Sequence, residues 1–337
     1  MTNTMRATRD TVVLKMKTGE YALVETACLC GEKKYILLAN KDRYDIPIQT
    51  VLCHACGLVR SNPYYTDKTL ADFYSKEYRL LYNGTQEATS EFFFEQRAFG
   101  RHIMTFLSEK VFGGEIKGKK IFEIGCGAGG ILEAFRENGN DVFGCDYGEA
   151  YIAFGKNKGL HLVAGGASTL RQFGTADIVI LNHVLEHIPR PAEELTQIKE
   201  LLSPTGTLYI ALPGIYYIHD TYRGNLTEYI QNAHAWYFTL KTLNSTLAVS
   251  GFQLVVGNEI IMAAFRKSDT PILPEKENWK NVLRYLKKTK RLRWYYGLKK
   301  FSPRHTAFET LRRIGPLYGV IRKLYRAYFT NNPKHEK

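Results

Sequence analysis

The feature that most constrains this chain is a glycine-rich loop between an apolar segment and a predicted helix. The loop, EIGCGAGG, spans residues 123–130 and follows the apolar run 119–124. Gly125 and Gly127 permit a tight turn and a close approach of the backbone to a ligand, because neither carries a Cβ atom. Asp146 lies 21 residues after Gly125, at the end of the next predicted strand, where a carboxylate can accept hydrogen bonds from ribose hydroxyls. The pattern predicts an α/β fold that binds a nucleoside-containing ligand.

The segments around the loop alternate between strand and helix patterns, which is typical of an α/β domain. The predicted strands are 119–124, 141–145, 160–164, 177–181 and 207–212, and the predicted helices are 131–138, 149–158, 192–202 and 239–250. Residues 251–265 then form two expected strands about a Gly257-Asn258 turn. The spacing of Gly125, Gly127 and Gly130 also fits the G-x-G-x-x-G fingerprint of NAD-binding folds. A closing hairpin, however, is not part of an ordinary dinucleotide-binding domain.

The region resembles the class I S-adenosylmethionine-dependent methyltransferases in the order of its motifs. These motifs are EIGCGAGG, GCDYG, NHVLEHIPRP, GTLYIALPG and HAWYFTLKTLNSTLAVSGF, which together cover about residues 119–265. The resemblance implies a Rossmann-like sheet with a terminal antiparallel hairpin and S-adenosylmethionine as the cofactor. The cofactor-binding residues it implies are Glu123, Gly125, Cys126, Gly127, Asp146, Tyr147, Ala167, Ser168 and Asn182. Members of the family often carry an acid near the position of Ala167, and the local sequence GGAST lacks one.

Three histidines are candidate catalytic residues. Methyl transfer to a hydroxyl requires a base, and an imidazole with a pKa near 6.5 suits neutral pH. His183 follows the fourth strand and is expected to face the transferred methyl group, His187 lies one helical turn later, and His234 lies in the insertion after the fifth strand. His183, Glu186 and His187 resemble a trio in ubiquinone-pathway O-methyltransferases that has been linked to a divalent metal. The LEH-x-x-x-P motif also occurs in methyltransferases with varied acceptors, so a packing or loop-capping role for His187 stays open. For His234, the alternative is a surface or hydrogen-bonded residue.

Four of the six cysteines form two pairs near the N-terminus, Cys28 with Cys30 and Cys53 with Cys56. Four thiolates on two turns suit a closed, structural zinc site in a reducing compartment. The region resembles the small zinc domain of sugar methyltransferases from deoxysugar and surface-glycan pathways. The first pair is C-x-C here rather than C-x-x-C, and four free thiols in a small β-domain are the alternative.

Aromatic residues follow the cysteines and recur in the insertion. Tyrosine offers a flat apolar face and a hydroxyl group to a sugar or an adenine. We therefore expect Tyr78 and Tyr82, and in the insertion Tyr216 and Tyr217, to form a lid or to contact the acceptor. Packing between the cysteine region and the main domain is the simpler alternative.

The basic excess is confined to the last 72 residues. Residues 266–337 carry 20 Lys and Arg against 5 Asp and Glu, whereas the whole chain has a net charge of +13. Their interspersed apolar residues predict a basic amphipathic helical extension, with an apolar face over 311–328. Docking on its own domain, contact with a second copy, an anionic membrane surface and nucleic acid are alternatives, in that order of preference.

The expected organisation is therefore a cysteine-rich zinc-ribbon-like domain (1–62), a Tyr/Phe-rich helical lid or linker (63–112), a methyltransferase domain (113–265) and a basic helical extension (266–337). The sequence contains no run of eighteen apolar residues and its first residues lack a secretory apolar segment, so a cytoplasmic enzyme, possibly peripheral at the inner membrane face, is expected.

The resemblances favour O-methylation of a sugar, a nucleotide-sugar or a lipid-linked glycan in bacterial surface-glycan biosynthesis. The alternatives are C-methylation of a nucleotide-linked ketosugar, methylation of RNA or protein through the basic tail, and a non-catalytic scaffold.

Overall fold

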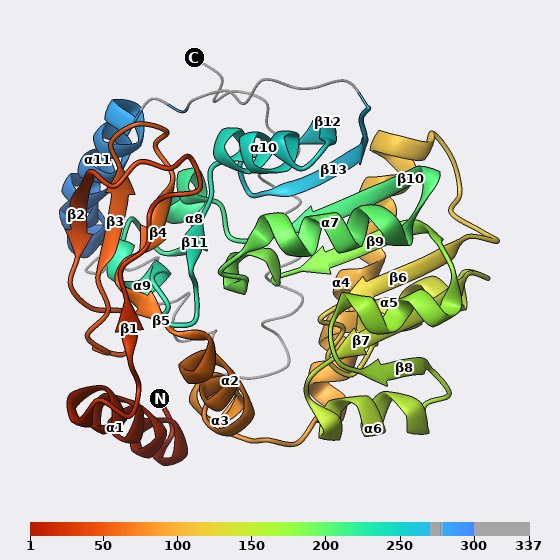
Figure 1. Cartoon of the computed structure of the whole chain (residues 1–337), viewed down its shortest axis with the longest axis horizontal. Coiled ribbons are helices and arrows are strands. Elements are labelled where there is room, and N and C mark those ends of the chain that lie inside the picture. Colours follow the sequence, from red (N-terminus) through yellow and green to blue (C-terminus); the bar gives the residue numbers. More distant parts are fainter. Residues whose placement is uncertain (270–276, 278, 300–337) are drawn as a thin grey trace.

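The computed structural model describes residues 1–269, 277 and 279–299, and its largest element is a seven-stranded sheet (Figure 1). Its strands are β6 (Lys120–Ile124), β7 (Asp141–Asp146), β8 (His161–Ala164), β9 (Ala176–Asn182), β10 (Leu202–Ala211), β12 (Phe252–Gly257) and β13 (Met262–Lys267). They are ordered β12-β13-β10-β9-β6-β7-β8. Strands β6, β7, β8, β9 and β10 are parallel to one another, and β13 is antiparallel to both β10 and β12. The predicted α/β class and its terminal hairpin are confirmed.

Helices cover both faces of this sheet. They are α4 (Ser90–Leu107), α5 (Gly130–Glu137), α6 (Glu149–Asn157), α7 (Pro191–Leu201) and α10 (Leu240–Val249). Successive side chains of a strand point to opposite faces, so Ile121 packs with α4, α5 and α6, whereas its neighbour Phe122 packs in the core cluster that contains α7 and α10. In β9, Ile178 likewise packs on the side of α4, α5 and α6, and Val179 packs on the side of α7 and α10. The central strands are therefore apolar on both sides, as is typical of a parallel sheet.

The boundary between α7 and β10 differs most from the sequence prediction. The helix expected over 192–202 ends at Leu201, and β10 begins at Leu202 rather than at residue 207. The register of β10 against β9 shifts between Leu202 and Thr207, so the strand contains an irregular start that the apolar pattern does not reveal.

The cysteine region forms a second, four-stranded sheet. Its strands are β2 (Tyr35–Ala39), β3 (Thr50–Cys53), β4 (Val59–Ser61) and β11 (Trp236–Tyr237), in the order β11-β4-β3-β2. Because β11 follows β10 in the chain, this sheet contains a strand from the insertion as well as strands from the expected N-terminal domain. A short pair, β1 (Leu23–Val24) with β5 (Tyr64–Tyr65), lies beside it. The two regions are thus joined by backbone hydrogen bonds.

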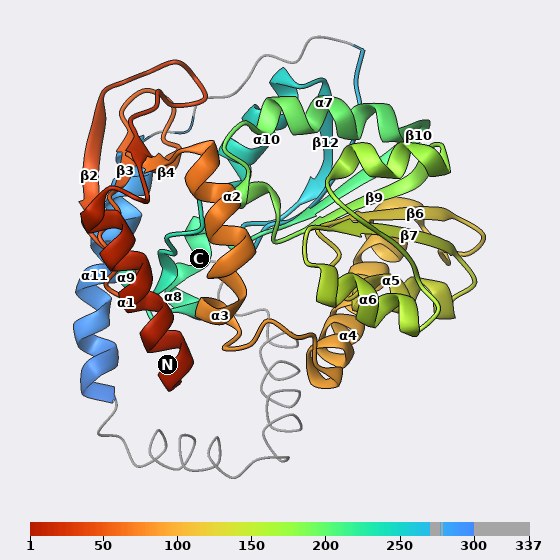
Figure 2. The same ribbon diagram turned by 60° about the horizontal axis from the view of Figure 1, so that its bottom comes forward.

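Three helices near the N-terminus lie between or beside the two sheets: α1 (Asn3–Thr18), α2 (Asp67–Lys76) and α3 (Tyr78–Tyr82). Figure 2 shows α2 and α3 between the small sheet and the seven-stranded sheet. The buried carboxylate of Glu77 fixes this arrangement, since it accepts from Lys15 Nζ at 2.9 Å and from the hydroxyl of Tyr21. The chain continues into α4 and a π-helical turn, η1 (Ser108–Phe112), where a helix was expected.

The basic extension begins with α11 (Trp279–Lys299), which packs on β3 and on the insertion. The insertion contains η4 (Ile215–Tyr217), α8 (Ile218–Thr221) and α9 (Leu226–Tyr229). Val282 and Leu286 of α11 are buried in this contact. The docking on its own chain that the sequence offered as one alternative is observed for α11, while residues 300–337, including the predicted apolar face over 311–328, lie outside the described residues. Within the described ranges, no helix combines the length and apolar character needed to cross a membrane.

Candidate functional site

The glycine loop lies at the carboxyl end of β6, where ligands bind in open α/β sheets. Gly125 has φ +70° and Gly127 has φ +54°, a region that favours glycine. A Cβ atom on Gly125 would lie 2.5 Å from Cγ2 of Val184, so the loop also packs closely against the segment after β9. The two glycines therefore have the role that the sequence predicted for the turn.

Asp146, the last residue of β7, is held by three donors. Its Oδ2 accepts from the backbone N–H of Gly127 at 2.9 Å, and its Oδ1 accepts from the backbone N–H of Gly148 at 2.7 Å. The guanidinium of Arg79, on α3, donates to Oδ1 at 3.0 Å. The predicted acid thus lies next to the glycine loop, and Arg79 is a functional candidate that the sequence analysis missed.

Glu123 precedes the loop and is only 2% exposed. Its Oε2 atom is buried without a hydrogen-bond partner. Burial, and then the nearby charge of Asp146, raise the pKa of the Glu123 carboxyl well above its usual range. Such an unsatisfied carboxylate costs free energy that a cationic group would offset. The donor set of Glu123, the two glycines and Asp146 therefore fits the ammonium and ribose of S-adenosylmethionine.

The remaining predicted cofactor residues have different environments. Asn182 ends β9 with its Oδ1 buried and unpartnered, and Tyr147 is 79% exposed beside Gly166. Ala167 is buried at the start of η2 (Ala167–Phe173), whereas Ser168 is exposed. Cys126 is buried, and its sulfur lies 2.7 Å from the position that a Cβ atom on Gly144 would take. This close contact indicates a packing role for Cys126.

The sequence near Ala167 contains no acidic residue, but in the structure an acidic residue of α7 lies beside it. Glu194, on α7, accepts a hydrogen bond from the backbone of Ala167, and burial raises the pKa of its carboxyl. Only the packing of α7 against η2 brings this residue to the third strand. No local pattern near Ala167 could have indicated it.

His183 stands directly after β9 with a positive φ of 56°. Its Nδ1 lies 3.3 Å from Oε1 of Glu186, whose side chain is 1% exposed, while the histidine side chain itself is 51% exposed. Neither carboxylate oxygen of Glu186 has a well-aligned hydrogen-bond partner. A buried carboxylate beside a half-exposed imidazole orients the ring.

His187 and His234 come from different loops and meet edge to face, with ring centroids 4.6 Å apart. The backbone carbonyl of Ala233 and the hydroxyl of Tyr74 lie 3.1 and 2.7 Å from Nδ1 of His187. Burial lowers the pKa of His187, and burial together with the charge of His187 lowers that of His234 further. Both rings are therefore neutral at neutral pH. Ligand atoms of Glu186, His187 and His234 lie within 4.8 Å of one another, a set that suits a divalent metal.

Tyrosines of α2 and α3 cover this histidine pair. The ring of Tyr78 lies edge-on to His187 at 5.9 Å, and Tyr82 donates to Oδ1 of Asn232 at 2.6 Å. Burial raises the pKa of Tyr78 to about 12, so its hydroxyl stays protonated. The structure thus brings Tyr78 and Tyr82 to the predicted site, together with Asn232, which had no sequence signal.

The tyrosines of the insertion lie elsewhere. Tyr216 packs against Tyr285 of α11, with ring centroids 5.0 Å apart, and Tyr217 belongs to the same short turn, η4. Tyr216 therefore packs in the contact with α11 rather than beside the histidine pair, because η4 is drawn into the apolar cluster beneath that helix.

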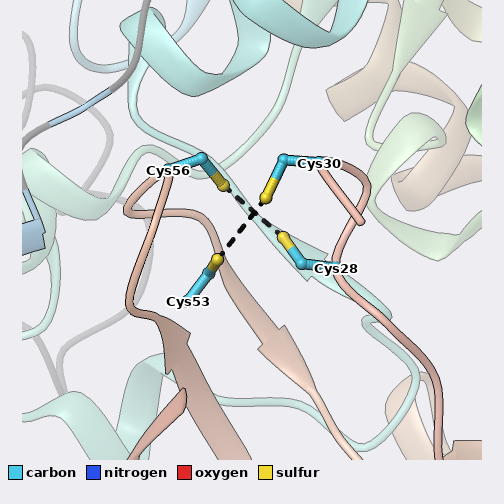
Figure 3. A group of neighbouring side chains, drawn as sticks. All are labelled: Cys28, Cys30, Cys53 and Cys56. Carbon is cyan, nitrogen blue, oxygen red and sulfur yellow. Dashed lines mark hydrogen bonds between the residues drawn. The ribbon is translucent and has the colours of Figure 1, made fainter. Parts of the chain in front are cut away.

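The four predicted metal ligands converge on one point (Figure 3). The sulfurs of Cys28 and Cys56 are 3.5 Å apart, and those of Cys30 and Cys53 are 3.6 Å apart. Gly31 and Gly57 have φ of +85° and +74° in the two turns. Hydrogen bonds from the neighbouring thiols lower the pKa of Cys53 and thus stabilise a thiolate. The C-x-C spacing is therefore compatible with a four-thiolate zinc site.

Comparison with known proteins agrees with this geometry. Residues 94–256 match a family described as a methyltransferase domain. Over these residues the chain is therefore similar to methyltransferase domains. The match to this methyltransferase domain contains the glycine loop, Asp146 and all three candidate histidines.

The curated relatives share part of this methyltransferase domain. Ubiquinone biosynthesis O-methyltransferases of Pseudomonas aeruginosa and Acinetobacter baumannii are 35% identical over 107 residues and 30% identical over 110 residues. These matches cover 28% and 29% of this chain, and 45% of each relative. The chain thus spans less than half the length of the curated relatives it matches.

A solved structure of Burkholderia thailandensis 1,6-didemethyltoxoflavin-N1-methyltransferase, with S-adenosylhomocysteine bound, also resembles the chain. It shares 18% identity and a TM-score of 0.45, covering 63% of this chain and 96% of that one.

Proposed function

We propose that the protein uses S-adenosylmethionine to methylate a hydroxyl group of a sugar in glycan biosynthesis. The observation that carries the proposal is the position of two sets of residues on one sheet edge. Glu123, whose Oε2 is buried without a partner, and Asp146 lie at the carboxyl ends of β6 and β7. His183 with Glu186 follows β9, the neighbour of β6.

The donor half of the site consists of the glycine loop and its acids. S-adenosylmethionine supplies a methyl group activated by a sulfonium centre. Glu123 would pair with its ammonium, and the two carboxylate oxygens of Asp146 would accept from the ribose hydroxyls. Gly127 leaves room beside the loop, whereas Gly125 allows the loop to turn against Val184. In-line transfer then depends mainly on the positioning of the acceptor.

His183 is the proposed general base. Its ring is half exposed and so accessible to an acceptor hydroxyl, and Glu186 stabilises the positive charge that the ring gains with the proton. His187 and His234 are held neutral and buried, so we assign them to orienting the acceptor rather than to accepting its proton.

A polar, aromatic surface supports a sugar as the acceptor. Tyr78 and Tyr82 offer flat faces and hydroxyls, and the fully buried Asn232 holds the hydroxyl of Tyr82 in place. The curated relatives named above are O-methyltransferases, which favours a hydroxyl acceptor over a carbon. Zinc bound by the four cysteines would hold the turns beside β3 and β4, and so the small sheet that includes β11.

The exposed face of α11 suggests where the enzyme acts. Five of the eight Lys and Arg residues of α11 recur at i, i+4, i+7, i+8 and i+11, and the helix contains no acidic residue. These five are Lys280, Arg284, Lys287, Lys288 and Arg291. The aromatic rings of Trp279 and Tyr285 pack against His54 and Tyr216 instead of pointing outward. Among the α11 side chains that the structure describes, residues 279–291, the exposed face is basic and the aromatic rings pack inward. Such a stripe favours an anionic lipid surface over stacking on nucleic acid. We therefore place the enzyme at the cytoplasmic membrane face, near a lipid-linked or nucleotide-linked sugar.

The test is a screen of sugar acceptors with methyl-labelled S-adenosylmethionine, read by product mass. Label on a hydroxyl, lost in His183→Ala, supports the proposal. Label on carbon, with deuterium wash-in next to a keto group, would instead indicate C-methylation. Labelled RNA or protein, or an intact pathway function in His183→Ala combined with Asp146→Ala, would contradict the assignment.

A further inference from the structure

The guanidinium of Arg79 donates a hydrogen bond to Asp146 and so takes an acceptor site that a ribose hydroxyl would need. A carboxylate has about four lone-pair sites. The backbone N–H groups of Gly127 and Gly148 take two of them, and Arg79 takes a third. The two neighbouring hydroxyls of a ribose require two sites, so only one is left for them. Of the three donors, only Arg79 is a side chain and can leave without unfolding the loop.

Arg79 is held firmly in this position. Its Cζ lies 3.5 Å from the centroid of the Tyr151 ring, within cation–π distance. Asn83, just after α3, donates to the hydroxyl of Tyr151 at 3.0 Å. The side chains of Arg79 and Asp146 are only 16% and 12% exposed, so solvent screens their attraction weakly. One side of α3 is therefore docked on the donor half of the site.

The other contacts of α3 belong to the acceptor half. Tyr78, the neighbour of Arg79 in the chain, lies edge-on to His187, and Tyr82 donates to Asn232. Since α3 has only five residues, a displacement of Arg79 is transmitted to both tyrosines. The helix connects the two halves of the site by consecutive residues.

We propose that Arg79 competes with the ribose of the donor for Asp146, and that its displacement moves α3 and sets the acceptor half of the site. This inference rests on the proposed use of S-adenosylmethionine. In the free protein the Arg79–Asp146 pair keeps α3 docked. Donor binding replaces the guanidinium by the ribose hydroxyls, so Tyr78 and Tyr82 adopt their acceptor-binding positions only when the donor is present. Donor and acceptor affinities are coupled as a consequence, each raising the other by the same factor.

The test measures binding of S-adenosylhomocysteine to the full chain by calorimetry. If Arg79 must leave, the apparent affinity is reduced by the fraction of protein in which it has left. Arg79→Ala should therefore bind about threefold to thirtyfold more tightly than the wild type. Arg79→Lys, which keeps the charge but loses the stacking geometry, should give an intermediate value. Arg97→Ala, which removes an ion pair between Arg97 of α4 and Glu137 of α5, is the matched control and should leave the affinity unchanged.

Two further measurements separate competition from a merely structural role. With a 2′-deoxy analogue of S-adenosylhomocysteine, which needs only one acceptor site, the advantage of Arg79→Ala should shrink to less than about twofold. Amide hydrogen exchange over residues 78–83 should change when S-adenosylhomocysteine binds the wild type, but not when it binds Arg79→Ala. Weaker or equal binding by Arg79→Ala, in a variant that unfolds at the wild-type temperature, overturns the inference while leaving the proposed function intact. A wild type that does not bind S-adenosylhomocysteine overturns the proposed function itself.

Discussion

His187 and His234 lie edge to face with ring centroids 4.6 Å apart, although one follows β9 and the other precedes β11. The contact is fixed by backbone hydrogen bonds: Ala235 donates to the carbonyl of Glu186 at 2.8 Å, and the hydroxyl of Ser61 donates to the carbonyl of His234 at 2.7 Å. The small sheet, the insertion and the methyltransferase domain thus meet at this pair, and its contacts give the first prediction.

The buried pair should make stability depend on pH. The pKa values of His187 and His234 are lowered in the folded protein, so between those values and about 6.5 the unfolded chain binds more protons. The free energy of unfolding should therefore fall as pH decreases below about 6.5. In urea unfolding at pH 7.5 and 5.5, His234→Gln should lose less stability between the two pH values than the wild type does. The exposed His102→Gln serves as control, and an equal loss in wild type and His234→Gln would contradict the assignment.

Replacing His183 should affect chemistry rather than donor binding. Loss of a general base lowers kcat by about 10²- to 10⁴-fold. We expect this loss in His183→Ala, with the affinity for S-adenosylhomocysteine unchanged within about twofold. Glu186→Gln should lower kcat less, because the base itself remains and only the carboxylate beside its Nδ1 is replaced. A His183→Ala enzyme with wild-type kcat would exclude this residue as the base.

Removing the carboxylate of Asp146 should weaken donor binding. Hydrogen bonds to a charged group contribute about 1.5–3 kcal/mol each, so Asp146→Ala should reduce affinity for S-adenosylhomocysteine at least about tenfold, even though it also frees Arg79. Calorimetry provides the measurement. Asp141→Asn, at the exposed start of the same strand β7, is the control. Equal affinity in Asp146→Ala would place the ribose elsewhere.

The four cysteines should hold one zinc ion per chain. Elemental analysis of the purified protein is expected to give a stoichiometry near one, lost in Cys53→Ser and retained in Cys126→Ser. Because the site holds the turns beside β3 and β4, Cys53→Ser should unfold about 5–10 °C lower than the wild type. A metal-free wild type with an unchanged unfolding temperature after chelation would show that the thiols serve packing alone.

The basic stripe of α11 should bind anionic vesicles. Each cation near such a surface contributes about 1 kcal/mol, so reversing Arg284, Lys287 and Lys288 to glutamate should lower binding to phosphatidylglycerol vesicles at least about a hundredfold. The matched control reverses three exposed lysines of the methyltransferase domain, Lys110, Lys117 and Lys156. Binding to RNA but not to vesicles, lost in the α11 variant, would identify the other anionic partner.

The sequence by itself determined the methyltransferase sheet and the donor half of the site. The strand that ends at Ile124, the glycine loop and Asp146 depend on local rules: apolar runs form buried strands, and a turn at positive φ favours glycine. The two cysteine turns were predictable for the same reason, since metal-ligand spacing is short in the chain. These features require no knowledge of how distant segments pack.

Only the tertiary structure decided which distant side chains complete both halves of the site. Glu194 reaches Ala167, Arg79 reaches Asp146, and Asn232 reaches Tyr82 across long stretches of chain, through packing that no local pattern encodes. The same holds for β11, a two-residue strand too short to show an alternating pattern. Contacts between distant segments depend on how the two sheets close around α2 and α3, and that arrangement is set by the whole core rather than by any one motif.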